Sequence, residues 1–346
     1  MVIARHSSFA YRGSEVDLRL ASRELGVRYI VEGSVRRAFS RLRINAQLID
    51  AIGNTVLWAN RFDRDLGDVF ALQDEIVREI VSALSGALPA AKWPAARRTN
   101  RIEAYDRFVH GRALVMRSAD SSVEAQRLFQ DAIDIDPDFS DAHAWLAISL
   151  VFGWLYSGDQ IERYPAGVAA ARRAVSLDPN NASAHSILGL LLIYGGKLEE
   201  ASEQIAIALN IDPNHALGWL FRACLRVNQG RPEEGIQCVR TAFLLNPHPQ
   251  GLDYWILGYA QYAARRYEEA VETLMNPVTR RTLSQRILAA ALAQLGRIEE
   301  ARIEAAEFLA TNPHFTIAHW AATDHFDRES DRQHFVEGYV KAGLPM

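Results

Sequence analysis

Apolar residues recur at helical spacing between Ala182 and Asn214, and this segment is the unit that much of the chain repeats. Leu188 and Leu192 share one helical face, and a turn at Gly195-Gly196 follows. A second amphipathic run then ends at Asp212-Pro213, because proline cannot continue a helix. The pattern predicts a helical hairpin.

Asx-Pro pairs mark the ends of successive units of this kind. They are Asp136-Pro137, Asp178-Pro179, Asp212-Pro213, Asn246-Pro247, Asn276-Pro277 and Asn312-Pro313. Successive prolines lie 42, 34, 34, 30 and 36 residues apart. This period predicts a solenoid, in which each hairpin buries its apolar face against its neighbours. We place six repeats at 106–139, 140–181, 182–215, 216–250, 251–281 and 282–315.

A second motif recurs inside the hairpins. It is a turn followed by Glu-Glu, as at Gly196 with Glu199 and Glu200. Glycine can adopt positive φ and end the first helix. The glutamates then fall in the first turn of the second helix, where the helix dipole favours negative charge. These paired carboxylates therefore indicate a structural role and not an acid–base site.

This layout resembles the tetratricopeptide repeat, and the resemblance implies a superhelix that binds other proteins without performing chemistry. It also implies that the second, fifth, ninth and twelfth residues of each first helix line the concave face. The predicted partner-binding groove contains Leu217, Leu220, Val227, Leu252, Trp255, Tyr259 and Tyr262. Relatives that grip a terminal carboxylate use Lys, Arg and Asn at such positions.

Because the predicted lining is apolar and aromatic, we expect a protein or peptide with an apolar segment as partner, with Trp255 and Tyr259 as anchors. The alternative is internal cover of this face. It would come from an aromatic insertion in the second repeat, Phe152–Tyr164, or from tight superhelical closure.

Residues 1–90 have a different pattern. Helical spacing covers Val16–Leu25, and a second helix is expected from Asp68 to about Leu88. Three strand-like runs lie between them, at Tyr29–Ala38, Leu42–Ile49 and Thr55–Phe62. The fold class is therefore two-part: a small α/β domain with an antiparallel meander, followed by an all-α superhelix.

Several short motifs in this region resemble those of a known domain family, which is itself defined by its similarity to the amino-terminal part of TolB. They are Tyr11-Arg12-Gly13, Ala21–Tyr29, Glu32–Arg36, Ala46–Asp50 and Leu57–Asp63. In bacterial proteins such a domain often lies between an effector and tetratricopeptide repeats. The effectors are usually class III adenylate or guanylate cyclases or winged-helix transcription regulators.

The family domain normally begins with a further strand and helix, before the position of Met1. We therefore expect a partial domain in residues 1–90, with an uncovered sheet edge that favours self-association. A basic linker is expected at 91–105, and a capping helix within 316–346.

Composition narrows the function further. The net charge of -4 argues against nucleic-acid binding, which needs a basic surface. The longest nearly apolar run, Ala144–Tyr156, is shorter than the ~20 residues of a membrane span. Two cysteines, Cys224 and Cys238, favour a reduced cytoplasmic setting over a disulfide framework.

No catalytic arrangement is recognisable in the sequence. His-Glu-x-x-His, a phosphate loop with lysine and paired Cys-x-x-Cys are all absent, so we expect no catalytic residue, metal or cofactor. His143 and His185 occupy equivalent repeat positions, which favours packing. We interpret the chain as a non-catalytic scaffold or sensor module of a bacterial signalling protein. The alternative is the regulatory C-terminal moiety of a class III cyclase, or of a winged-helix regulator, whose effector is missing from this sequence.

Overall fold

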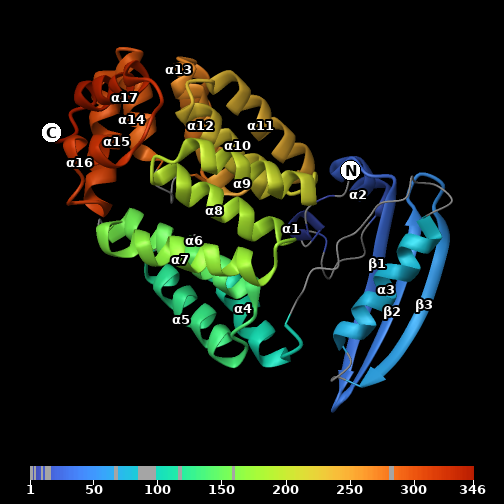
Figure 1. The fold of residues 1–346 in the computed structure, drawn as a ribbon. Helices are drawn as coiled ribbons and strands as arrows, with labels where there is room; N and C mark the ends of the chain where they lie inside the picture. Colours follow the sequence, from blue (N-terminus) through green and yellow to red (C-terminus); the bar gives the residue numbers. More distant parts are fainter. Residues whose placement is uncertain are drawn as a thin grey trace. The chain divides into compact units, whose positions relative to one another are not determined.

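The computed structural model describes residues 3, 5–8, 11, 17–65, 69–84, 99–115, 119–157, 160–279 and 284–346 (Figure 1). The chain divides into two compact units, residues 3–95 and 96–346. None of the helices in the described residues combines the length and the apolar character that a membrane-spanning helix needs.

The first unit contains a three-stranded antiparallel sheet with the strand order β1-β2-β3. Its elements are α1 (Arg5–Ser8), α2 (Leu18–Leu25), β1 (Tyr29–Ala38), β2 (Arg41–Asp50), β3 (Thr55–Asp65) and α3 (Val69–Leu84). The side chain of Asp17 caps α2 by accepting from the backbone N–H of Arg19 at 2.9 Å. Gly26 ends that helix with a φ of 63°. The predicted helix starts, Val16 and Asp68, lie outside the described residues.

Helix α3 lies on the sheet face that carries Trp58 and Asn60, because both side chains donate to the carboxylate of Glu79 at 3.2 and 2.8 Å. Cross-strand pairing places Val31 opposite Leu48, and Leu48 opposite Trp58, in one row across the sheet. Leu48 is buried, whereas Val31 on β1 is 51% exposed. The helix therefore covers the β2–β3 half of this apolar face and leaves the β1 half open.

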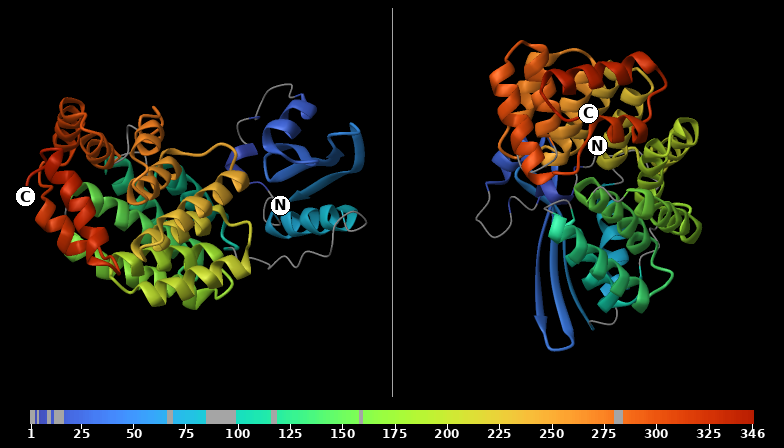
Figure 2. Two further views of the ribbon diagram at one scale, coloured as in Figure 1. Left: turned by 90° about the horizontal axis from the view of Figure 1, so that it is seen from above. Right: turned by 90° about the vertical axis from the view of Figure 1, so that its left-hand side faces the viewer.

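The second unit is a succession of helical hairpins, which Figure 2 shows as a curved stack. Its helices are α4 (Ile102–Leu114), α5 (Ala119–Ile135), α6 (Ser140–Ser157), α7 (Gln160–Leu177), α8 (Ala182–Tyr194), α9 (Leu198–Ile211), α10 (Ala216–Asn228), α11 (Pro232–Leu245), α12 (Gly251–Ala263), α13 (Tyr267–Leu274), α14 (Gln285–Gln294), α15 (Ile298–Thr311), α16 (Ile317–Thr323) and α17 (Glu329–Lys341). Consecutive helices from α4 to α15 pack as pairs. The predicted two-part fold class is confirmed.

The turns inside the hairpins depend on a left-handed residue. Gly196, Gly230 and Gly296 have φ values of 71°, 69° and 77°. In the fifth hairpin Arg265 takes this conformation instead, with φ 61°. Helix α13 in that hairpin has only eight residues, because Asn276-Pro277 follows it closely and proline cannot continue a helix.

The second hairpin carries its extra residues inside its helices and not as a separate insertion. The extra residues lengthen both of its helices, α6 and α7, to 18 residues each. The side chains of residues 152–162 lie outside the described part of the chain, so the predicted aromatic cover by Phe152–Tyr164 is not described.

Candidate functional site: the concave face and its cover

The first helices of neighbouring hairpins, α8, α10 and α12, pack side by side. The predicted groove residues lie on α10 and α12. Leu217, Leu252 and Trp255 are half-buried at the margin of the central core. Leu220, Val227, Tyr259 and Tyr262 are buried. Leu217, Leu252 and Trp255 thus form an open end, and Val227, Tyr259 and Tyr262 form a covered end. Leu220 belongs to the central core.

At the open end, the ring of Trp255 stacks flat on the ring of Tyr259, with centroids 5.6 Å apart and planes 2° from parallel. The residues are four apart on α12, so both side chains emerge from the same helical face. Trp255 also packs beside Leu252 on the border of the apolar core. An aromatic platform thus marks the transition from the open end to the covered end.

The covered end lies under residues from the C-terminus, which we call the cover segment (Asp324–Phe335). The hydroxyl of Tyr262 donates to the carbonyl of His334 at 3.2 Å, and the two rings stack at 4.8 Å. Phe335 lies 5.4 Å from Tyr259 and 4.8 Å from Tyr262 between ring centroids. Closure of this face therefore comes from the chain's own end.

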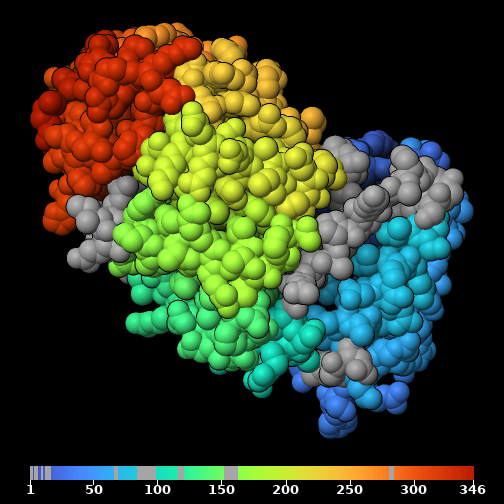
Figure 3. Space-filling view, in the orientation of Figure 1, coloured from blue at the N-terminus to red at the C-terminus, as the bar shows by residue number. Residues whose placement is uncertain are grey.

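Asn228, the last residue of α10, holds the cover segment where it crosses the hairpins. Its side-chain amide donates to the carbonyl of His325 at 2.7 Å and to the carboxylate of Asp324 at 3.4 Å. Its backbone carbonyl accepts from the N–H of Asp327 at 2.9 Å. The space-filling view shows the C-terminal part of the chain, in red, beside the yellow-green α8–α9 hairpin (Figure 3).

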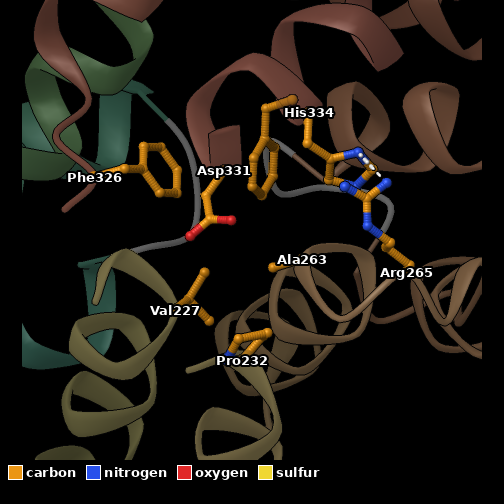
Figure 4. A pocket seen from close by; sticks show the side chains of 8 residues that line it. Val227, Pro232, Ala263, Arg265, Phe326, Asp331 and His334 are labelled. Atoms are coloured by element: carbon orange, nitrogen blue, oxygen red, sulfur yellow. Dashed lines mark hydrogen bonds between the residues drawn. The ribbon is translucent and has the colours of Figure 1, made fainter. Parts of the chain in front are cut away.

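A small cavity of about 30 Å³ remains beneath the cover segment (Figure 4). Its lining includes Val227, Pro232, Ala263, Arg265, Phe326, Asp331, His334 and Phe335. Arg265 reaches His334 at 3.4 Å, and the carboxylate of Asp331 points into the space. A cavity of this size holds about one water molecule, so it is a packing gap beside Asp331 and not a substrate pocket.

Arg286 on α14 fixes helices α16 and α17 in place. Its guanidinium lies 5.3 Å from the ring centroid of Tyr339, 5.6 Å from Trp320 and 5.4 Å from Phe315. Such cation–π contacts are strongest where the cation is desolvated. Residues 316–346 thus pack on α14, and α17 also contacts α12.

Burial dominates the electrostatics of this region. It raises the pKa of Asp324, and the positive charge of Arg286 opposes that shift. Burial lowers the pKa of His334, and Arg265 lowers it further. Burial raises the pKa of the Cys224 thiol to about 12, so this cysteine is protonated at neutral pH and is a poor nucleophile.

Within the described residues, no cluster of three or more His, Cys, Asp or Glu side chains has the geometry to hold a metal ion. His143 and His185, predicted to pack, each hydrogen-bond through Nε2 to the carbonyl of the proline six residues earlier, at 2.9 and 3.0 Å. Trp219 makes the equivalent bond at 3.0 Å. These rings therefore brace the turns between repeats.

Sequence reasoning missed Asn228 and the cover segment. Asn228 directly follows the twelfth position of its helix, and its partners lie 96 and 97 residues later. The one available signal was a polar amide at the end of an otherwise apolar face. Nothing in a repeat pattern indicates which distant segment such an amide contacts.

The tetratricopeptide repeat family model matches residues 160–216 and 222–276. Among solved structures, the human IFIT1 dimer has a TM-score of 0.51 and 19% identity, with coverage of 78% of this chain and 63% of that one. A thermophilic tetratricopeptide repeat protein of Thermus thermophilus has a TM-score of 0.41 and 17% identity, with coverage of 60% and 99%. The likeness to the IFIT1 dimer concerns the fold alone.

One curated relative is a Rhizobium meliloti (strain 1021) protein named "Putative adenylate cyclase 3". It is 50% identical over 150 residues, which are 42% of this chain and 26% of that protein. The match thus spans about a quarter of the relative's length. This chain contains tetratricopeptide repeats, and part of it is closely similar to part of a protein named as an adenylate cyclase.

Proposed function

We propose that this chain is a non-catalytic protein-binding scaffold that binds an apolar segment of another protein at the open end of the concave face. The observation that carries the proposal is the flat stack of Trp255 on Tyr259, with Trp255 half-buried at the margin of the core. Aromatic anchors of this kind supply most of the binding energy in protein interfaces. Leu217 and Leu252 provide apolar surface beside the same core.

The test compares Trp255→Ala with Leu244→Ala, which removes an exposed leucine from α11. Tagged wild-type protein captures partners from the native host, and each purified partner is then titrated against both variants. We expect Trp255→Ala to weaken binding by ~30-fold or more, which is about 2 kcal/mol, and Leu244→Ala to leave it unchanged. If Trp255→Ala lowers stability by ~3–5 kcal/mol and no partner is lost, Trp255 is a core residue and the proposal is wrong.

A second candidate is the regulatory C-terminal moiety of a class III adenylate or guanylate cyclase. The 50% identity to part of the cyclase-named relative favours it. In this arrangement the three-stranded sheet of the first unit is a partial TolB-like domain between effector and repeats. A winged-helix regulator is the alternative effector. Both cysteines are free and buried, which supports a reducing, cytoplasmic compartment.

The genomic DNA directly upstream distinguishes these effectors. An in-frame cyclase segment supports the second candidate, and an in-frame winged-helix segment replaces it.

A parallel assay supplies the purified chain with nucleotide triphosphate and metal. We expect no cyclic AMP or cyclic GMP, because catalysis would reside in the effector. Product formation that survives re-purification would contradict the non-catalytic scaffold.

A further inference from the structure

The contact between Asn228 and the cover segment has the geometry of peptide recognition. The carbonyl of His325 and the N–H of Asp327 flank residue 326, and both bond to Asn228, at 2.7 and 2.9 Å. An extended strand added to another element is held by the same kind of main-chain bonds. Because these bonds use backbone groups, they fit any extended peptide.

Two side chains give the contact its chemical character. Asp324 bonds to Asn228 and faces the positive charge of Arg286. Phe326 packs on Phe335 and Trp320, with ring centroids 5.4 and 6.3 Å apart. The residues between and after them, His325 and Asp327, are exposed. The surface therefore accommodates a carboxyl side chain followed two positions later by an aromatic one.

The hairpin turns are shaped to let this segment pass. A Cβ atom at Gly196 would lie 3.0 Å from the ring of His325, and one at Gly230 would lie 2.7 Å from the carboxylate of Asp331. Gly296 forms the same left-handed turn, yet a Cβ atom there would meet nothing within 4 Å. A Cβ atom at either of the first two turns would therefore press on a side chain of the cover segment, whereas the third turn does not face that segment.

Asn228 also connects to the open end of the concave face. Its side-chain oxygen accepts from the hydroxyl of Tyr259 at 3.0 Å, and Tyr259 stacks on Trp255. A ligand that lies along Trp255 would therefore reach the position of the cover segment. Its own acid and aromatic side chains could then replace Asp324 and Phe326.

We propose that Asn228 and its surroundings form a peptide-binding subsite, which the chain fills with its own Asp324–Asp327 segment. The partner's docking segment is an extended peptide with an acidic residue two positions before an aromatic one. This inference rests on the proposed scaffold function and deepens it by naming the chemistry of the ligand. In the free protein the internal segment competes at an effective concentration on the order of millimolar.

The test titrates a fluorescent peptide with the sequence of residues 323–329, Thr-Asp-His-Phe-Asp-Arg-Glu, into the full chain and follows fluorescence anisotropy. The protein variants are Gly196→Ala, which presses a Cβ atom on the His325 ring and so loosens the internal segment, and Gly296→Ala, which has the same backbone strain without the contact. We expect the peptide to bind Gly196→Ala at least ~10-fold more tightly than wild type or Gly296→Ala. A peptide with Phe326→Ala should lose this gain.

Asn228→Ala combined with Gly196→Ala should abolish peptide binding. If Gly196→Ala fails to fold, Phe326→Ala in the protein frees the same subsite by removing the anchor ring. Circular dichroism and thermal unfolding verify each variant. Equal, weak affinity of wild type, Gly196→Ala and Phe326→Ala would overturn the inference. If captured partners still depend on Trp255, the scaffold proposal survives that result.

Discussion

The two units of this protein differ in how completely they cover their apolar faces. In the repeat unit, Tyr262 and Phe335 are fully buried because the cover segment returns onto the concave face. In the first unit, Val31 and Val35 of β1 stay 51% and 64% exposed. A helix is about 10 Å wide and strands lie about 4.8 Å apart, so α3 can cover roughly two of the three strands. A stack of hairpins can close with its own end, whereas a narrow sheet needs a further element.

The substitution with the largest expected effect on stability tests the covered end of the concave face. Phe335→Ala removes a buried ring that contacts Tyr259, Tyr262 and Trp320. We expect the free energy of unfolding of the repeat unit to fall by ~3–5 kcal/mol, the range for buried aromatic residues replaced by alanine. Urea unfolding followed by circular dichroism measures the loss.

Val340→Ala is the matched control, because it lies on the same helix α17 but is 48% exposed. Its effect should stay within about 0.5 kcal/mol. If both substitutions had equally small effects, α17 would be only loosely attached, and the repeat unit would be as open as the sheet.

The next largest expected effect is a difference between the two units in how their stability depends on pH. Burial raises the pKa of Asp253 on α12 to about 6, against roughly 3.9 in an unfolded chain. As pH rises from roughly 4 to 6, the unfolded state loses its proton first, so the repeat unit loses stability. A pKa difference of this size between the folded and unfolded states corresponds to ~3 kcal/mol, fully lost above about pH 6. Asp253→Asn should remove this slope.

The first unit should respond in the opposite direction. Arg28 donates to Asp50 at 2.8 Å and lowers the pKa of that carboxyl. A lowered pKa gives stability that is present at neutral pH and is lost as pH falls through the folded-state value. Hydrogen exchange measured segment by segment, corrected for the pH dependence of intrinsic exchange, separates the two units. The same sign of slope in both would contradict this assignment.

Local sequence patterns predicted most of the architecture. Strand β1 has the predicted bounds, Tyr29–Ala38, because alternation and flanking turns act within a few residues. Helix α8 likewise begins at Ala182 and ends at Tyr194, beside the predicted turn at Gly195. The placement of Trp255 and Tyr259 on one helical face also follows from a spacing of four.

The burial of the groove could not be predicted in this way. Val227 occupies a position that repeat arithmetic assigns to the concave face, but its exposure depends on Phe326 and Phe335, about a hundred residues later. Tyr262 depends similarly on His334, 72 residues away. To predict such contacts one must know the curvature of the superhelix, and a repeat period near 34 residues does not give that curvature. Internal cover of this face is the alternative that the sequence leaves open, with the aromatic insertion or tight superhelical closure as its source. The side chains of residues 152–162 lie outside the described part of the chain, and the cover that the structure describes comes from the cover segment.

The smallest expected effect on stability belongs to the exposed strand β1. Among the described residues β1 forms an edge of the sheet, and edge strands readily pair with another chain. If two copies of β1 pair antiparallel about Gly33, Val31 of each copy lies opposite Val35 of the other. The predicted self-association through residues 1–90 would use this register, which continues the apolar row that already contains Leu48.

Val35→Lys tests this register, because a lysine on an edge strand opposes pairing between chains. The side chain is 64% exposed, so the free energy of unfolding should change by less than about 0.5 kcal/mol. Sedimentation velocity over a series of concentrations should show association of the wild type and its loss in Val35→Lys. Ile52→Lys is the control, because Ile52 is 70% exposed but lies in the turn after β2. A wild type that stays monomeric at every concentration would show that β1 is not a self-association surface. Equal association of Val35→Lys and the wild type would place any contact elsewhere on the chain.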